Sequence, residues 1–182
     1  FSRSHNRAAL YGMMLLNGLG IANHMLATLT TPVLGAVVLH ALIRQRVEIK
    51  HLFVAGAIWV AGTLPYSGLI VLEWNRTGDL AATLYSAFFG TLNQNPVLNT
   101  SLSPRLLMSL LFPVYNFPNL LLPAAVYGLL RGKDLSIPRV LRRALVAGLV
   151  IHALFVFRYS IVDQHTFFLP TYLFLTIFGG VG

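Results

Sequence analysis

Two long stretches without charge constrain the fold of this chain most strongly. Residues 8–43 and residues 106–130 contain no Asp, Glu, Lys or Arg, and an apolar run of about 18 residues or more is typical of a helix that crosses a membrane. The composition agrees, since 56% of the residues are hydrophobic and 10% are charged, whereas a soluble domain carries about 25% charged residues. We therefore expect an integral, multi-pass membrane protein with an all-α fold.

The first uncharged run predicts two membrane crossings. As one helix, residues 8–43 would be about 54 Å long, and the hydrocarbon core of a bilayer is only about 30 Å thick. A hairpin of two short crossings fits better. The helix-weakening glycines in residues 18–24 mark the expected break between them.

The rest of the chain extends this arrangement to about six short or kinked spans, which we treat as one transmembrane domain over residues 1–182. The further spans are predicted at residues 52–72, 106–130, 144–159 and 167–182. Proline lacks a backbone N–H, so we expect kinks where it falls inside a span, as at Pro65. Residues 73–105 are the longest polar stretch and are predicted to form a loop. Their apolar segment 80–92 is too short to span, and lies along the interface or re-enters the membrane.

The formal charge of +8 is concentrated in the connectors. Basic residues occur at Arg3 and Arg7, then at Arg44, Arg46 and Lys50, and five times within residues 131–143. Basic connectors tend to stay on the cytoplasmic side, so we interpret the charge as membrane orientation and expect no nucleic-acid partner. Asn23 and His24, the loop 73–105 and residues 163–165 then share the opposite side.

These polar residues are the candidates for function, because polar groups near bilayer depth are costly to keep. Asn23 and His24 offer hydrogen bonds to a sugar or phosphate oxygen, or they cap the break in the hairpin. Asp163 is a general base, a metal ligand, a carboxylate that holds Arg158 for an anionic ligand, or a turn cap. Arg158 alternatively snorkels from a helix end toward the headgroups.

Glu73 and Asp79 are a second candidate pair, six residues apart in the predicted loop. Two carboxylates near a membrane surface bind a divalent ion or take a proton from an acceptor hydroxyl, and the alternative is ordinary solvation. The sequence has no Walker loop, no His-Glu-x-x-His, no Gly-x-Ser-x-Gly and no cysteine. ATP-driven transport, zinc proteolysis and thiol catalysis therefore have no support.

Two stretches carry a family resemblance. Gly18-Leu-Gly-Ile-Ala-Asn-His24, which precedes a proline-containing apolar run, and residues 159–170 (YSIVDQHTFFLP), which precede Gly179-Gly-Val-Gly182, resemble the domain-of-unknown-function 2723 family. The animal member of that family is a transmembrane protein O-mannosyltransferase. Residues 73–79 and 112–118 fall where the family has a polar outer loop and a proline-rich span, so the likeness covers nearly the whole chain.

The resemblance implies a GT-C type glycosyltransferase, a polytopic helical enzyme that takes a sugar from a polyprenyl-phosphate donor at the outer or luminal face. The acceptor is a protein hydroxyl or a glycan, no cofactor is implied, and the need for a divalent metal stays open. The implied catalytic residues are His24 and Asp163. The implied substrate-binding residues are Asn23, Glu73, Asp79, Arg158, Gln164 and His165, with Arg158 as the phosphate partner.

Such enzymes carry an acidic base in their first outer loop, which we expect to precede Phe1, in a longer polypeptide of which this chain is a piece. The host membrane is a bacterial inner membrane or the endoplasmic reticulum. Two other classes stay open. A transporter or flippase core for a lipid-linked or small polar substrate also uses short, kinked helices, and a noncatalytic assembly subunit would not need these polar residues for activity.

Overall fold

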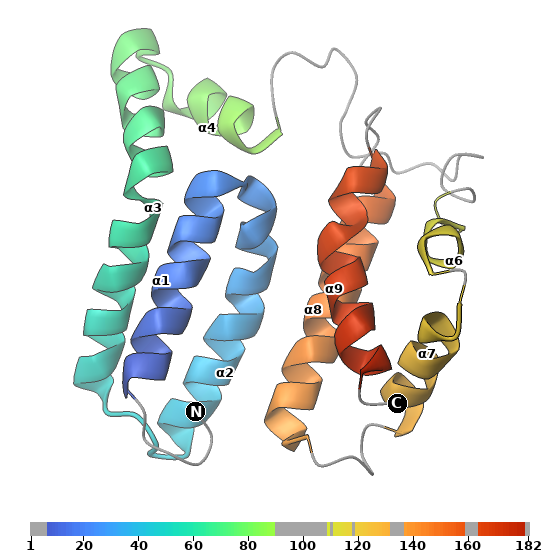
Figure 1. The fold of residues 1–182 in the computed structure, drawn as a ribbon. Coiled ribbons are helices and arrows are strands. Elements are labelled where there is room, and N and C mark those ends of the chain that lie inside the picture. Colours follow the sequence, from blue (N-terminus) through green and yellow to red (C-terminus); the bar gives the residue numbers. More distant parts are fainter. Residues whose placement is uncertain are drawn as a thin grey trace. The chain divides into compact units, whose positions relative to one another are not determined.

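The computed structural model describes residues 7–89, 109, 111–117, 119–131, 137–158 and 164–180. These residues form eight α-helices and two short 3-10 helices, which confirms the all-α prediction for the part that is described. The chain divides into two compact units, Phe1–Gln94 and Asn95–Gly182, and each is described by itself (Figure 1).

The first unit contains three long helical segments that run up, down and up (Figure 1). Its elements are α1 (Arg7–Asn23), the 3-10 helix η1 (Met25–Thr30), α2 (Thr31–Ile43), α3 (Ile49–Thr77) and α4 (Leu80–Phe89). The uncharged run of residues 8–43 is thus divided between α1 and the η1–α2 segment, with His24 between them. The helix α3 ends at Gly78, whose φ of 73° is the left-handed C-cap conformation that glycine adopts most easily.

The glycines that we expected to weaken the hairpin have a different role. Gly18 and Gly20 lie inside α1, which continues to Asn23. A Cβ atom on Gly18 would lie 2.5 Å from the carbonyl oxygen of Trp59, and one on Gly62 would lie 3.0 Å from the Cα of Gly18. Small residues of this kind let the backbones of two membrane helices approach closely. Gly18 and Gly62 therefore set the contact between α1 and α3.

The contacts between α1 and α3 also establish their relative direction. Near the start of both helices, the Tyr11 hydroxyl lies 2.7 Å from Nδ1 of His51, and further along Gly18 meets Gly62. Both positions advance together, so the helices are parallel. The C-terminal ends of α1 and α3 therefore lie at the same end of the unit.

The second unit is built on α9. Its elements are α6 (Phe112–Asn116), α7 (Leu121–Arg131), α8 (Arg139–Arg158), the 3-10 helix η2 (Gln164–Phe168) and α9 (Leu169–Gly179). Its core consists of Ala125, Val156, Phe168, Tyr172, Leu175 and Phe178, so α9 and η2 supply four of the six buried side chains. The Asn116 side-chain amide donates to the Tyr172 hydroxyl at 2.9 Å and fastens α6 to α9.

The prolines begin helices more often than they kink them. Pro113 stands in the first turn of α6 and Pro123 in the first turn of α7, where a backbone N–H has no acceptor within the helix. Pro32 and Pro170 start α2 and α9 in the same way. The predicted span 106–130 therefore contains the separate helices α6 and α7, whereas Pro65 lies inside α3.

Among the described residues, three segments are long and apolar enough to cross a membrane. They are Met25–Ile43 with 19 residues, Ile49–Thr77 with 29 and Arg139–Arg158 with 20, and the shorter apolar helices are Leu121–Arg131 and Thr166–Gly179. Large apolar side chains on these segments face outward, as Phe53 (75% exposed) and Leu72 (66%) do, which suits contact with lipid. These candidate spans indicate an integral, multi-pass membrane protein.

The helix bounds differ from the predicted spans where charged residues are involved. The helix α3 extends through Glu73 and Arg76, which we expected in a loop, and α8 takes in Arg142 and Arg143 before the predicted start at residue 144. Long charged side chains are compatible with helix ends because they reach the aqueous layer from there. Backbone geometry at Gly78, not the appearance of charge, ends α3.

Candidate functional site

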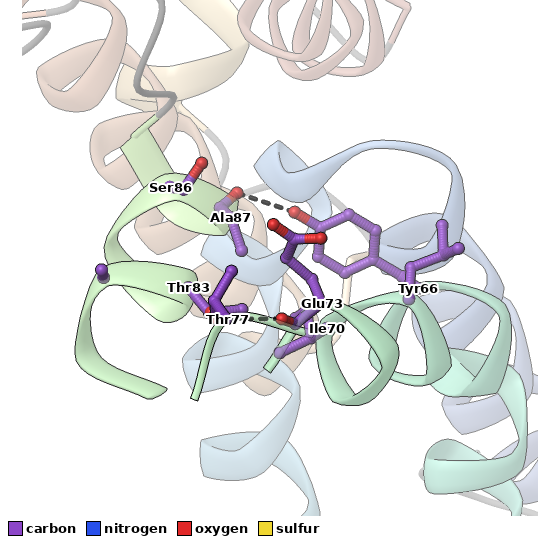
Figure 2. Close-up of a pocket in the computed structure, with 9 residues that line it drawn as sticks. Tyr66, Ile70, Glu73, Thr77, Thr83, Ser86 and Ala87 are labelled. Carbon is purple, nitrogen blue, oxygen red and sulfur yellow. Dashed lines mark hydrogen bonds between the residues drawn. The ribbon is translucent and has the colours of Figure 1, made fainter. Parts of the chain in front are cut away.

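A pocket of about 330 Å³ lies between the C-terminal part of α3 and the helix α4. Figure 2 shows the side chains of α3 rising toward α4, which turns back after Gly78. The polar lining residues are Tyr66, Glu73, Thr77, Thr83 and Ser86, and the apolar ones are Leu69, Ile70, Ala82 and Ala87. Four hydroxyl groups and one carboxylate thus surround a cavity at the end of a candidate membrane span.

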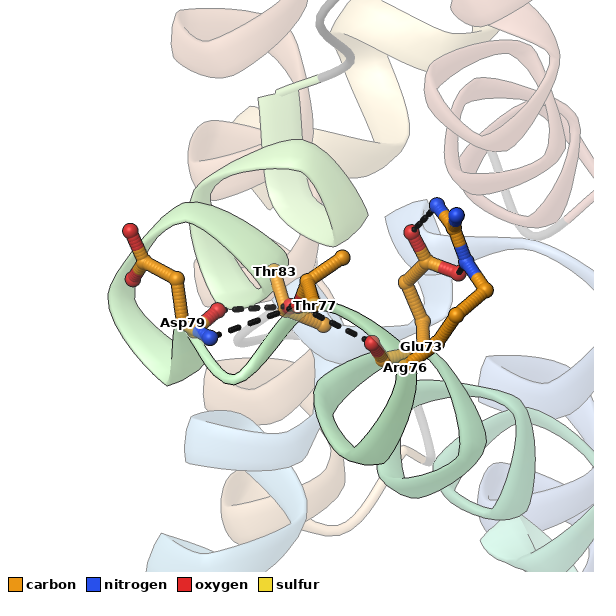
Figure 3. A network of polar contacts seen from close by, with 5 residues as sticks. All are labelled: Glu73, Arg76, Thr77, Asp79 and Thr83. Atoms are coloured by element: carbon orange, nitrogen blue, oxygen red, sulfur yellow. Dashed lines mark hydrogen bonds and ion pairs between the residues drawn. The ribbon is translucent and has the colours of Figure 1, made fainter.

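Hydrogen bonds hold the turn between α3 and α4, as Figure 3 shows. Asp79 precedes the first residue of α4, and its Oδ1 accepts a hydrogen bond from the Ala82 amide at 2.9 Å. The Thr83 hydroxyl donates to the Asp79 carbonyl at 2.7 Å and lies 3.2 Å from the Thr77 hydroxyl. Asp79 is therefore the N-cap of α4 and is absent from the pocket lining.

Glu73, unlike Asp79, lines the pocket. Its carboxylate accepts two hydrogen bonds from Arg76, with Nε 2.8 Å from Oε2 and Nη2 2.6 Å from Oε1. Such a bidentate pair orients both groups. Both side chains are largely exposed, so the pair contributes at most about 1 kcal/mol to stability. Arg76 was missed by the sequence analysis, although its position three residues after Glu73 on a helix was a usable signal.

Tyr66 connects the two walls of the pocket. Its hydroxyl donates to the Ala87 carbonyl of α4 at 2.7 Å (Figure 2). Sequence reasoning missed this residue too. Its spacing of seven residues before Glu73 places both side chains on the same face of α3, which was the available signal.

Asn23 and His24 lie at the same end of the unit as the pocket, but they do not line it. The Nδ1 atom of His24 accepts a hydrogen bond from the Leu26 amide at 3.2 Å and caps η1, in line with the capping alternative. Asn23 ends α1, and both side chains are exposed. Because Gly18 faces Gly62, α1 ends level with about Ser67, and Glu73 lies about 9 Å further along the axis.

The most extensive polar network of the unit centres on a residue that sequence reasoning passed over. Asn17 is only 8% exposed. Its Nδ2 donates to the Ala27 carbonyl at 3.1 Å and the Thr30 hydroxyl at 2.7 Å. Its Oδ1 accepts from the Thr31 hydroxyl at 3.0 Å and from Nε1 of Trp59 at 2.9 Å. This one amide joins α1, η1, α2 and α3, and a polar residue inside an uncharged run was its signal.

The candidates of the second unit are described only in part. Arg158 is the last residue of α8 and is exposed, where its charge complements the negative end of the helix dipole. Gln164 and His165 begin η2. Asp163 lies outside the described residues, so its predicted role stays a prediction.

Within the described ranges, no group of three or more His, Asp or Glu side chains is placed to hold a metal ion.

Comparisons with family models, with curated proteins and with solved structures found no match for this chain. The resemblance to the domain-of-unknown-function 2723 family stays a prediction. The fold and the site define a class, namely a multi-pass helical membrane protein with a hydroxyl-rich pocket beside one of its candidate spans.

Proposed function

We propose that this chain is the membrane-embedded portion of a glycosyltransferase that transfers a sugar from a polyprenyl-phosphate donor to an acceptor hydroxyl. The observation that supports the proposal best is the position of the α3/α4 pocket, at the polar end of a helix long enough to span the bilayer. A lipid-linked sugar has a polar head and a long apolar tail, so it needs both environments side by side.

The lining of the pocket fits the head of such a donor. Hydroxyl and carboxylate groups give the directional hydrogen bonds that sugar hydroxyls require. The volume of about 330 Å³ is at the lower end of the roughly 300–1,000 Å³ typical of small-molecule sites, which favours one sugar unit over an oligosaccharide.

The surface next to the pocket fits the tail. Leu69 lines the pocket and is 62% exposed, and Leu72 on the same helix is 66% exposed. A prenyl chain that packs along these side chains stays in the hydrocarbon region while its sugar reaches the pocket.

The chemistry of the transfer assigns roles to Glu73 and Arg76. The acceptor oxygen forms a bond to the anomeric carbon, the bond from that carbon to the phosphate oxygen breaks, and the phosphate leaves with the bonding electrons. In this proposal Glu73 takes the acceptor proton and Arg76 stabilises the phosphate. His24 and Asp163 stay in the proposal as further catalytic residues, and Asn23, Arg158, Gln164 and His165 as donor contacts.

The charge distribution supports the outer or luminal face as the location of the pocket. Four of the five basic residues described in the first unit lie at its opposite end, which the positive-inside tendency assigns to the cytoplasm. The proposed membrane is a bacterial inner membrane or the endoplasmic reticulum.

The transporter alternative receives less support from the described residues. A transporter needs polar groups near the middle of the membrane that a substrate reaches from both sides. The buried amide of Asn17 donates two hydrogen bonds and accepts two, all with protein partners. It therefore has a structural role and is not open to a substrate.

The test is sugar transfer by the full-length protein in membranes, with labelled polyprenyl-phosphate sugars as donors. We expect Glu73→Gln to lower the rate by about 10²-fold or more, the usual contribution of a positioned base. Glu48→Gln makes the same chemical change at the opposite end of the first unit, and we expect it to leave the rate unchanged. Equal rates for both variants would remove Glu73 from catalysis. Unchanged rates for Glu73→Gln and His24→Ala would favour a noncatalytic subunit, and no transfer by the unmutated protein would favour the transporter.

A further inference from the structure

The end of the first unit opposite the pocket carries a concentration of positive charge. Within residues 7–89, five Lys or Arg residues are described, and four of them gather here: Arg7 starts α1, Arg44 follows α2, Arg46 lies in the connector and Lys50 is in the first turn of α3. We call these four residues the basic collar. The acids Glu73 and Asp79 lie at the other end, so the unit is electrically polarised along its axis.

The carboxylate of Glu48 neutralises only part of this positive charge. Glu48 lies 2.5 Å from Nζ of Lys50 and 3.9 Å from Nη2 of Arg7. The hydrogen bond and the charge of Lys50 lower the pKa of Glu48 below its ordinary value, so it is ionised at neutral pH. The collar with Glu48 thus has a net charge of +3, from four cations and one anion.

The helix ends reinforce the positive potential. The N-termini of α1 and α3 and the C-terminus of α2 meet at this end (Figure 1), and the partial positive charges of the two N-termini exceed the partial negative charge of the one C-terminus. Glu48, the N-cap of α3, makes no capping hydrogen bond with its side chain. The connector between α2 and α3 spans only residues 44–48, which holds the collar close to these helix ends.

Apolar surface lies directly beside the collar. Ile43 is the last residue of α2 and Ile49 the first of α3, and they are 69% and 63% exposed, while Phe53 one turn further is 75% exposed. Cations that border exposed apolar side chains at the end of membrane-crossing helices match the layer where phosphate headgroups meet acyl chains.

We infer that the basic collar binds the phosphate-bearing headgroups of anionic phospholipids, whose acyl chains lie against Ile43, Ile49 and Phe53. The apolar contacts decide between a lipid and a soluble phosphate ion, because only the lipid uses them. This inference rests on the multi-pass membrane class of the protein and is independent of the proposed glycosyl transfer.

The test measures lipid association with the full-length protein in phosphatidylcholine vesicles, using spin-labelled phosphatidylglycerol and spin-labelled phosphatidylcholine as probes. We expect the unmutated protein to prefer phosphatidylglycerol. The variant Arg44→Gln/Arg46→Gln should weaken this preference by up to about fivefold for each charge removed. Gln45→Ala changes the same exposed connector without removing a charge and should leave the preference unchanged.

Two further arms separate the inference from its alternatives. Arg44→Lys/Arg46→Lys keeps the charge and should keep the preference, which shows that the loss in the glutamine variant is not a folding defect. Inorganic phosphate at equal ionic strength should not displace the labelled lipid. The inference is overturned if the unmutated protein shows no preference, if Gln45→Ala weakens it as much as the double glutamine variant, or if phosphate displaces the lipid.

Discussion

The amide of Asn17 allows the most direct test of how the first unit is held together. It makes four hydrogen bonds to three other helical segments, at 2.7 to 3.1 Å, and it uses every donor and acceptor that an asparagine side chain has. In Asn17→Ala all four bonds are lost at once. The loss falls on the contacts between α1, η1, α2 and α3.

The expected cost follows from the partners that are left behind. A hydrogen bond between membrane helices contributes about 0.6 kcal/mol on average, so four of them amount to about 2.4 kcal/mol. The indole N–H of Trp59 also loses its acceptor, and an unsatisfied buried donor costs about 1–3 kcal/mol. The loss costs less at the Thr30 hydroxyl, because this group keeps its hydrogen bond to the Ala27 carbonyl at 2.7 Å. We therefore expect Asn17→Ala to lower the free energy of unfolding by about 3–5 kcal/mol.

The measurement is reversible unfolding of the full-length protein in mixed micelles, with the fluorescence of Trp59 as one readout of the α1/α3 contact. Asn23→Ala is the matched control, because it removes the same group from an exposed position on the same helix and should change the free energy by less than about 0.5 kcal/mol. In a double-mutant cycle, Asn17→Ala and Trp59→Phe should couple rather than add. Equal stabilities for Asn17→Ala and Asn23→Ala would refute the reasoning.

Three further predictions concern single contacts of the first unit. Gly18→Ala should lower the free energy of unfolding by about 1–3 kcal/mol, because the new Cβ would lie 2.5 Å from the Trp59 carbonyl oxygen. Gly12→Ala, with nothing within 4 Å, should raise it by up to about 1 kcal/mol, so equal signs in thermal unfolding would contradict the close contact. Asp79→Ala should cost about 0.5–2 kcal/mol through the lost N-cap of α4, measurable as faster hydrogen exchange at the Ala82 amide, whereas Asp79→Asn should retain most of the protection. The pKa of Glu48 is lowered from 4.5, chiefly by its hydrogen bond to Lys50, so its ion pairs stabilise the fold above about pH 4.5 and this contribution is lost as the pH falls through the lowered pKa. A pH titration of stability should show this step in the unmutated protein and lack it in Glu48→Gln.

The sequence predicted the helices and the hairpin best, because these follow from the length of the runs without charge. A run without charge has to avoid water, and a run as long as residues 8–43 has to turn once to stay within the bilayer, so helices and a hairpin followed from length alone. Proline was harder to interpret, because the same missing N–H that kinks a helix interior costs nothing in the first turn. Pro113 and Pro123 could not be distinguished from Pro65 without knowing where each helix begins.

The candidate site shows where sequence reasoning ended. Glu73 and Asp79 are the same kind of residue, six positions apart, and only the turn at Gly78 separates a carboxylate that lines a pocket from one that caps α4. Asn17 and Asn23 were likewise two amides in one apolar run, and only the packing of α1 against α3 made the first the centre of a network.

The sequence by itself predicted a helical chain with several candidate membrane spans and showed that its basic residues gather in the connectors. These properties depend on the free energy of transfer of each segment, which adds up residue by residue. Tertiary structure alone decided which polar side chains meet, since hydrogen bonds depend on distances between segments far apart in the chain. The α3/α4 pocket, the Asn17 network and the close contact of Gly18 with Gly62 all belong to this second group.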